Sequence, residues 1–557
     1  MIRWATFIIP FFSLLAAGCV SLPEAEDPVL VQDLPTMKDI ADSLQNERAA
    51  ALKWVVQSGR VDHVFQSDVD WSREFTAFLQ DDVNHLRYKD AYSVSDTVDD
   101  GLRTVTFLAL SDGQEVRKMK YVIRSGRLSG FELVKDRSNF LSSSSQMFRF
   151  DDGEYSLSIK QNIDWFFENN QFIHGSIVPR GVLWRAVFDL GGDPLPVQCL
   201  LQDSVLIVKN GRELLRFPKT GLRGDSVVFS SSFFNAYFQL LRTDENNMVG
   251  RWVNQKRDIK KTTPVRFTRG VPFRFQVGES APRDIQGEHL MLFADHEGVF
   301  NDSAVLIIHQ SEHEISGSIM TETGDYRFLE GVVRGDSMFL STMDGTHAYL
   351  FQGAIRSDSI LGVFCVGQST KQPWLAKLGT THSLPSAETI TEVSSGRFDF
   401  SFPDQDGKIV ALSDDRFRDK VTLVTIMGTW CSNCLDETLF LKKVRERYAE
   451  TDLQIVALDF ELVSDSLVAQ TNIQRHIKSL AVPYPVLLAS LATTKERAST
   501  LLPSLNGVFS YPTLIVLDRN HDVVKIHTGF NGPATGGDRY MKFERAYFTL
   551  FDSLVAE

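Results

Sequence analysis

The alternation of hydrophobic and polar residues divides the chain into regions with different predicted elements. Met37 to Gln57 carries apolar residues at roughly helical spacing, whereas Thr104 to Leu110 and Lys118 to Ile123 alternate as strands do. Residues 19–138 are therefore predicted to form a tether followed by a small α+β module. The four consecutive serines at 142–145 then predict a flexible joint.

The middle of the chain carries short alternating strands separated by Gly, Asp and Asn turns, which predicts all-β structure. The tetrapeptide Arg-Gly-Asp-Ser at Arg223 to Ser226 recurs at Arg334 to Ser337, and two further matches occur in the same order. These matches predict a duplicated all-β domain, with repeats at residues 147–272 and 273–378. Because both tetrapeptides precede predicted strands, they favour turns over an adhesion motif.

The all-β region also contains a distinctive turn and two isolated cysteines. Thr321 to Tyr326 predicts a hairpin, with Gly324 at the position that needs a positive φ. Cys199 and Cys365 lie in strand-like surroundings, and we expect them to be buried free thiols. A bridge between them stays open, because exported cysteines can pair.

The last region changes pattern again. Residues 379–396 are rich in Ser, Thr and Glu and predict a linker into a final domain at residues 397–557. There a β-branched apolar run at Val421 to Met427 predicts a strand, and a helical stripe comes after the pair Cys431 and Cys434. The predicted fold class is multidomain, with a C-terminal α/β domain after the duplicated all-β domains and the small N-terminal α+β module.

The first residues predict export. Met1 to Arg3 gives a short basic start, and the apolar run from Trp4 to Leu15 is shorter than the about 20 residues that span a bilayer. The Ala-Ala-Gly-Cys sequence ending at Cys19 resembles a bacterial lipobox, which implies removal of a signal peptide at residues 1–18 and lipidation of the Cys19 thiol. The alternative is an ordinary cleaved signal and a soluble envelope protein. Either way we expect the mature chain to face one aqueous compartment outside the cytoplasm.

Composition excludes several classes of function. Hydrophobic residues make up 43% and charged residues 23%, as in ordinary globular proteins, which argues against wholesale disorder. A net charge of −13 repels phosphate backbones and argues against nucleic-acid binding. Five cysteines are too few for a disulfide-dense scaffold, and only Cys431 and Cys434 lie close together in the sequence.

The order of strand, Cys-x-x-Cys and helix has a chemical consequence. A helix start presents unpaired N–H groups and the positive end of the macrodipole, so we expect a lowered pKa and a thiolate at Cys431. Cys431 is then the attacking sulfur. Cys434, one turn into the helix, would attack the mixed disulfide at Cys431 and release reduced substrate.

A family resemblance adds to this interpretation. Trp430 to Cys434 with Glu437 resembles the thioredoxin-like TlpA and ResA group of envelope thiol-disulfide oxidoreductases, which are redoxins of the AhpC/TSA type. Phe400 to Lys408 resembles the added N-terminal hairpin of that group, and Ser510 to Thr513 resembles its cis-proline loop. The resemblance implies a thioredoxin-like fold at residues 397–557.

The same resemblance implies roles for single residues. Cys431 and Cys434 would form the redox-active disulfide, and Trp430, Tyr511 and Pro512 would contact the substrate. A carboxylate at Glu437 could accept the proton of Cys434. The alternative for Glu437, as for Asp436, is the favourable placement of an acid at a helix start.

The resemblance further implies net reduction of disulfides in envelope proteins, apocytochromes c among them. Because a domain outside the cytoplasm has no electron source of its own, a membrane electron carrier of the DsbD or CcdA kind is expected as partner. Lipidated Cys19 would hold the chain on the bilayer. The β regions also resemble modules that precede TlpA-like domains in lipoproteins of Bacteroidetes-type bacteria.

Other chemistry fits the cysteine pair less well. Zinc needs two more ligands nearby, and covalent haem needs His where Leu435 stands. A peroxiredoxin would need Pro and Thr where Val424 and Gly428 stand. We therefore expect no metal and no cofactor. The remaining alternative is an envelope binding protein whose β modules hold a protein or glycan, with the redox domain secondary.

Overall fold

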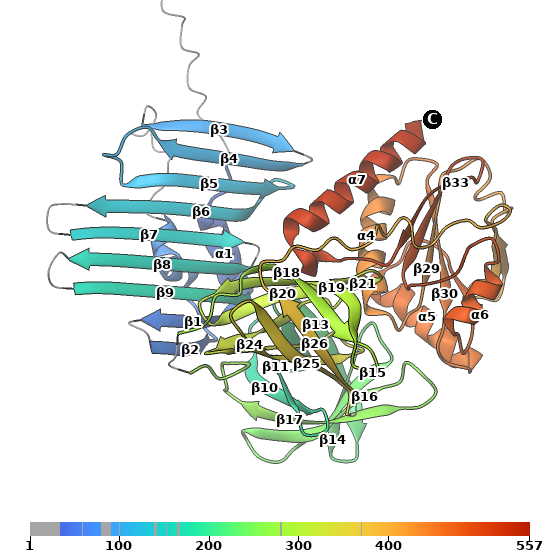
Figure 1. Cartoon of the computed structure of the whole chain (residues 1–557), viewed down its shortest axis with the longest axis horizontal. Coiled ribbons are helices and arrows are strands. Elements are labelled where there is room, and N and C mark those ends of the chain that lie inside the picture. The colour runs from blue at the N-terminus through green and yellow to red at the C-terminus, as the bar shows by residue number, and fades with distance from the viewer. Residues whose placement is uncertain are drawn as a thin grey trace, which may run out of the picture.

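A computed structural model describes residues 34–57, 60–79, 91–99, 101–138, 142–151, 153–163, 167–278, 281–368 and 370–556. The predicted export signal, most of the predicted tether and Cys19 lie outside these residues. The described part forms an N-terminal sheet with helices, two β-barrels and a C-terminal α/β domain (Figure 1). Within these ranges, no helix combines the length and the apolar character that crossing a membrane requires.

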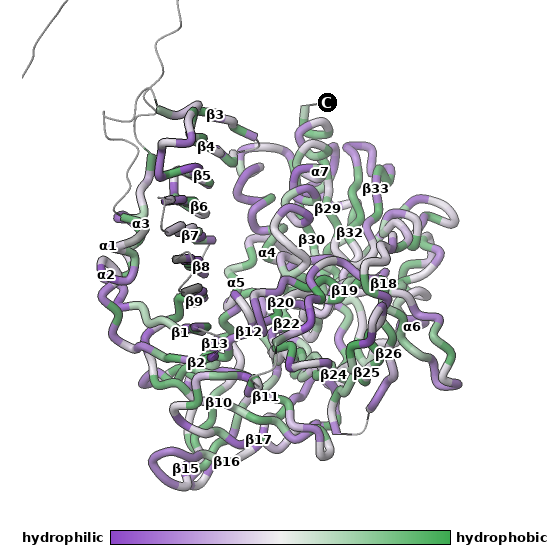
Figure 2. Tube along the Cα trace, turned by 60° about the vertical axis from the view of Figure 1, so that its left-hand side comes forward, coloured by the Kyte–Doolittle hydropathy of each residue, from purple (hydrophilic) through white to green (hydrophobic). Residues whose placement is uncertain are grey.

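The described N-terminal residues form one antiparallel sheet of nine strands in the order β2-β1-β9-β8-β7-β6-β5-β4-β3. Helices α1 (Met37–Glu47), α2 (Trp71–Glu74) and α3 (Thr76–Leu79) lie along one face of it (Figure 2). Apolar side chains of this helical segment and of the sheet form one core. The strands are β1 (Ala50–Gln57), β2 (Arg60–Gln66), β3 (Tyr92–Asp99), β4 (Leu102–Ala109), β5 (Val116–Arg124), β6 (Arg127–Ser138), β7 (Ser142–Asp151), β8 (Glu154–Ile163) and β9 (Phe167–Val178).

Two expectations for this part differ from the structure. The helix predicted over Met37 to Gln57 ends at Glu47, and the segment with Trp54, Val55 and Val56 forms β1, because β-branched and aromatic residues suit a strand paired on both sides. The predicted serine joint lies in β7, whose backbone pairs with both β6 and β8. The N-terminal sheet therefore continues to Val178.

The first barrel comes directly after this sheet. Its eight strands close in chain order, and a cluster of buried aromatic rings around Phe238 fills the interior. The strands are β10 (Val182–Asp189), β11 (Pro194–Leu201), β12 (Val205–Asn210), β13 (Glu213–Arg223), β14 (Ser226–Ser230), β15 (Ala236–Arg242), β16 (Asn247–Asn254) and β17 (Lys261–Arg269).

The second barrel repeats this pattern, and pairing of β19 with β20 closes its sheet. The Arg-Gly-Asp-Ser tetrapeptides form the β13–β14 and β22–β23 turns, where Gly224 has φ 59° and Gly335 has φ 56°, so the turn prediction is confirmed. The strands are β18 (Gly287–Ala294), β19 (Phe300–Ser311), β20 (Glu314–Thr321), β21 (Gly324–Asp325), β22 (Leu329–Arg334), β23 (Ser337–Met343), β24 (Ala348–Ile355), β25 (Ser359–Val366) and β26 (Thr370–Lys377).

The C-terminal domain is built on a mixed sheet of five strands, in the order β31-β30-β29-β32-β33. Its central strand β29 (Thr422–Met427) pairs in parallel with β30 (Gln454–Phe460) and antiparallel with β32 (Thr513–Leu517). The predicted N-terminal hairpin is present as β27 (Ser401–Pro403) and β28 (Ile409–Ala411). The other elements are β31 (Val486–Ser490), β33 (Val523–Thr528), α4 (Ser432–Arg447), α5 (Ser466–Leu480), α6 (Lys495–Leu501), η2 (Pro533–Thr535) and α7 (Gly537–Ala556).

The segment predicted as a linker is packed onto this last domain. Thr391 N donates to Thr528 Oγ1 at 3.2 Å, and Ser394 N donates to the Ser504 carbonyl oxygen at 2.8 Å. Since both contacts join the linker to the C-terminal domain, the second barrel is connected to that domain through ordered chain.

Candidate active site

The cysteine pair lies where β29 ends and α4 begins, as the sequence pattern predicts. Cys431 is the residue that caps α4: its Sγ accepts a hydrogen bond from Cys434 N at 3.1 Å. The two residues form a disulfide with their Cα atoms 5.2 Å apart. Cys431 is 7% exposed and Cys434 is 1% exposed, so Cys431 is the sulfur nearer to solvent. An amide N–H directed at this sulfur stabilises a thiolate when the disulfide is reduced.

The predicted cis-proline loop lies beside the pair. The Tyr511–Pro512 bond is cis, and the Tyr511 carbonyl oxygen is 3.3 Å from Cys431 Sγ. The ring of Trp430 lies 5.4 Å from that of Tyr511, and its indole N–H donates to the Phe460 carbonyl oxygen at 2.9 Å. The structure thus brings Trp430, Tyr511 and Pro512 to the sulfur of Cys431, the residue predicted to attack the substrate. Trp430 and Tyr511 are half-buried and keep some surface toward solvent.

Glu437 lies one helical turn after Cys434 and is 2% exposed. Thr425 Oγ1, on β29, donates to Glu437 Oε2, while Oε1 has no hydrogen-bond partner among the described residues. Burial raises the pKa of this carboxyl to about 8, and the Thr425 hydrogen bond opposes the shift. A carboxyl that changes its charge near pH 8 on the face of Cys434 is suited to proton exchange with that thiol.

Asp436, expected to serve as a simple helix-start acid, has a specific partner in the second barrel. Its Oδ2 is 2.8 Å from Arg327 Nη1, and the same guanidinium donates to the Ser432 carbonyl oxygen at 2.5 Å and pairs with Glu213 of the first barrel. Burial raises the pKa of Asp436 to about 7, against the effect of Arg327. Arg327 therefore joins three domains at the start of α4. No local sequence signal marks it, because its partners lie far away in the chain.

Two further acids at the carboxyl end of β30 were not identified from the sequence. Asp459 Oδ1 accepts from Thr429 N at 3.0 Å, and Glu461 accepts from the hydroxyl of the same Thr429. Burial raises the pKa of both carboxyls. They hold the residue that precedes Trp430. Acids that end an apolar strand were a visible signal for them.

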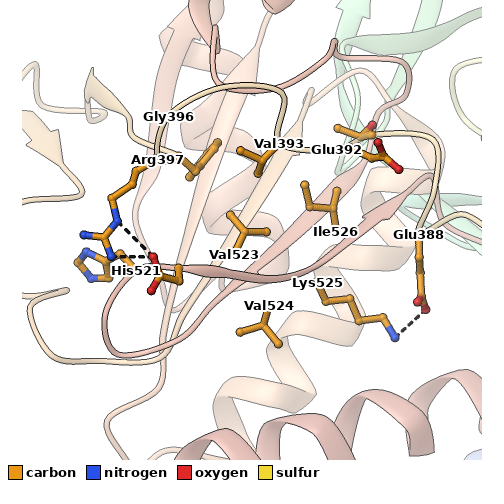
Figure 3. A pocket seen from close by; sticks show the side chains of 13 residues that line it. Glu388, Glu392, Val393, Gly396, Arg397, His521, Val523, Val524, Lys525 and Ile526 are labelled. Carbon is orange, nitrogen blue, oxygen red and sulfur yellow. Dashed lines mark hydrogen bonds and ion pairs between the residues drawn. The ribbon is translucent and has the colours of Figure 1, made fainter.

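Cys199, Cys365 and a groove at the edge of the C-terminal sheet lie away from the disulfide. Cys199 and Cys365 are buried and unpaired, which confirms the expectation of free thiols, and burial raises the pKa of Cys199 to about 12. A groove of about 420 Å³ runs along the sheet edge at β33 (Figure 3). Four of its charged side chains are paired with one another, Arg397 with Asp522 and Lys525 with Glu388, both at 2.6 Å. None of the predicted site residues lines it.

Comparison with known proteins agrees with this site. The Redoxin family model matches residues 391–538. The thiol-disulfide oxidoreductase ResA of Geobacillus thermodenitrificans is 26% identical over 157 residues, which are 28% of this chain and 81% of that protein. ResA of Bacillus cereus is 24% identical over 140 residues, 25% of this chain and 72% of that protein.

A solved thiol-disulfide oxidoreductase from Bacteroides fragilis is 18% identical, covers 26% of this chain and 96% of its own, and has a TM-score of 0.20. From the family match and the ResA relatives, the C-terminal part is a thioredoxin-like redoxin domain of the thiol-disulfide oxidoreductase type. Cys431 and Cys434 are its Cys-x-x-Cys pair.

Replacing Arg327, the cation that joins the three domains, tests how much it contributes to the stability of the protein. Arg327→Ala should lower the free energy of unfolding by about 3–5 kcal/mol, because it leaves two buried carboxylates without their partner. Urea unfolding of the full chain measures this. Arg334→Ala is the control: Arg334 is an exposed arginine of the same barrel that stacks on Phe339 and should cost about 1 kcal/mol or less. Equal losses in the two variants would contradict the assignment.

Proposed function

We propose that this protein reduces disulfides of other proteins in the cell envelope, with Cys431 as the attacking thiolate. One observation carries the proposal: Cys431 Sγ lies at a helix start, 3.3 Å from the carbonyl that precedes a cis-proline. A helix start activates the thiolate, and the backbone of the adjacent cis-proline loop offers a place for a substrate strand. Relatives named as thiol-disulfide oxidoreductases support this chemistry.

The reaction is determined by the positions of the two sulfurs. The Cys431 thiolate attacks one sulfur of the substrate disulfide, forms a mixed disulfide and releases the other substrate sulfur as a thiolate. The Cys434 sulfur, after losing its proton, then attacks Cys431, forms the disulfide seen in the structure and releases the second substrate thiolate. Two electrons pass to the substrate in all, and the two substrate thiolates take up their protons from solvent. Glu437, on the same helix face as Cys434, accepts the proton of that thiol.

The setting of this reaction is part of the proposal. The export signal and the lipobox-like sequence at Cys19 support a lipid-anchored protein that faces the periplasm, in the arrangement of Bacteroidetes-type lipoproteins. Each turnover leaves a disulfide, so a membrane electron carrier of the DsbD or CcdA kind must restore the dithiol. Apocytochromes c are one class of substrate. Membrane retention of a Cys19→Ser variant in its native cells would contradict the lipid anchor.

Cysteine variants of the full chain test the reaction directly. Cys431→Ser should abolish reduction of insulin by dithiothreitol beyond the uncatalysed rate, because the remaining sulfur, Cys434, is only 1% exposed. Cys434→Ser should instead accumulate a mixed disulfide between Cys431 and the substrate, visible by mass spectrometry. Cys199→Ala removes a buried thiol outside the site and should leave the rate unchanged. An active Cys431→Ser protein would refute the proposal.

Glu437→Gln tests the proton transfer. Resolution of the glutathione mixed disulfide at Cys431 should accelerate in the native protein as pH rises toward about 8, where the Glu437 carboxyl loses its proton. At pH 8 the variant should resolve about 100-fold more slowly, at the lower end of the contribution of a general base. Acid quenching and mass spectrometry measure the step. Glu446→Gln, exposed on the same helix, is the control, and identical profiles for Glu437→Gln and the native protein would exclude the role.

A further inference from the structure

One hairpin of the second barrel contacts the loops around the redox pair. We call residues Thr321 to Arg327, which include the β20–β21 turn, the redox-facing hairpin. Its Thr323 carbonyl oxygen accepts from Ser510 Oγ, in the cis-proline loop, at 2.8 Å. Its Asp325 Oδ2 accepts from Gly532 N, in the loop after β33, at 2.5 Å. Arg327 of the hairpin also bonds to the start of α4, so the hairpin contacts three separate segments of the redoxin domain.

The contact leaves no space between the two backbones. A Cβ atom added at Gly529 would lie 2.5 Å from the Thr323 carbonyl carbon. A Cβ atom added at Gly324 would lie 2.1 Å from Asn433 Nδ2, the side chain between the two cysteines. The Thr323 backbone leaves no room for a methyl group at Gly529, and a methyl group at Gly324 would require the Asn433 amide to move. A substrate chain therefore cannot pass between the hairpin and the redoxin domain on this side of Cys431.

The contact is also built to stay in place. The side chain of Arg327 is 3% exposed and is paired with Glu213 and Asp436, each on a different domain. Moving the hairpin away would leave buried charges without partners, which is strongly unfavourable. This favours a fixed wall over a mobile lid.

The duplicated barrel supports a docking role for this hairpin. The equivalent turn of the first barrel joins β12 to β13, where Asn210 pairs with Glu213. In the second barrel, Thr321 pairs with Gly324 in the same way. The first turn also docks on the next domain: Gly211 N donates to Glu330 Oε2 at 2.6 Å. In each barrel this turn therefore contacts the domain that follows it in the chain. For the second barrel, that domain is the redoxin domain with the cysteine pair.

We propose that the redox-facing hairpin is a fixed wall of the substrate site, so that the second barrel takes part in substrate selection. Disulfides reach Cys431 from the side of the half-buried Trp430 and Tyr511 rings. The site therefore accepts small disulfides and disulfides on protruding flexible segments, and discriminates against disulfides held in bulkier folded proteins. This inference rests on the proposed function.

Displacing the hairpin in the full chain tests the wall. Gly324→Leu places a side chain against Asn433 and the Phe530 backbone. With pre-reduced protein in single turnover, it should speed oxidation by insulin about tenfold, equivalent to about 1.4 kcal/mol, and change oxidation by glutathione disulfide less than about twofold. Alkylation and mass spectrometry of the Cys431 and Cys434 peptide measure both reactions. Gly298→Leu is the control, in a turn of the same barrel where a Cβ atom meets nothing within 4 Å, and should change neither rate.

The outcomes separate the alternatives. An unchanged insulin rate, equal acceleration of both substrates or slowing of both would overturn the wall, since equal acceleration would indicate a lid over the sulfur. If Gly324→Leu fails to fold by circular dichroism, Gly529→Ala acts on the same contact from the redoxin side, through the Thr323 backbone. The proposed function fails separately, if the native protein reacts with neither disulfide.

Discussion

The position of Cys431 at the start of α4 is the constraint on which the site depends. Its sulfur accepts a hydrogen bond from Cys434 N and lies against the Tyr511 carbonyl oxygen. The central strand β29 holds this helix start from inside the domain, and Arg327 holds it from outside through the Ser432 carbonyl oxygen. Each of these contacts pairs a buried side chain with a backbone atom, so the helix start is held by groups that have little freedom to move.

The contact of Arg327 with the start of α4 links the β domains to the redox site. Arg327 is buried between Glu213 of the first barrel and Asp436 of α4, so the two barrels and the redoxin domain share one charge network. Such a network is weak evidence for stability as such, yet it strongly disfavours separating its members. The barrels are therefore part of the surroundings of the redox pair, in contrast to modules joined only by a flexible linker.

Local pattern was sufficient for much of the fold and the site. The strand, Cys-x-x-Cys and helix order, the Arg-Gly-Asp-Ser turns and the Thr321 to Tyr326 hairpin each depend on neighbouring residues. The cis-proline came from family resemblance. Local pattern failed where tertiary pairing decides: the serines of β7 are a strand because β6 and β8 flank them. The contacts of Arg327 could not be predicted, because they join residues distant in the chain.

A redox titration of the Cys431 and Cys434 pair in the full chain tests whether this pair works as a reductant. Peptide-level alkylation across glutathione and dithiothreitol buffers would report these two thiols separately from the others. A reductant should show a reversible two-electron transition with a midpoint below about −230 mV. A midpoint above about −180 mV would contradict the reductive direction, and the absence of any reversible transition would contradict the enzyme itself.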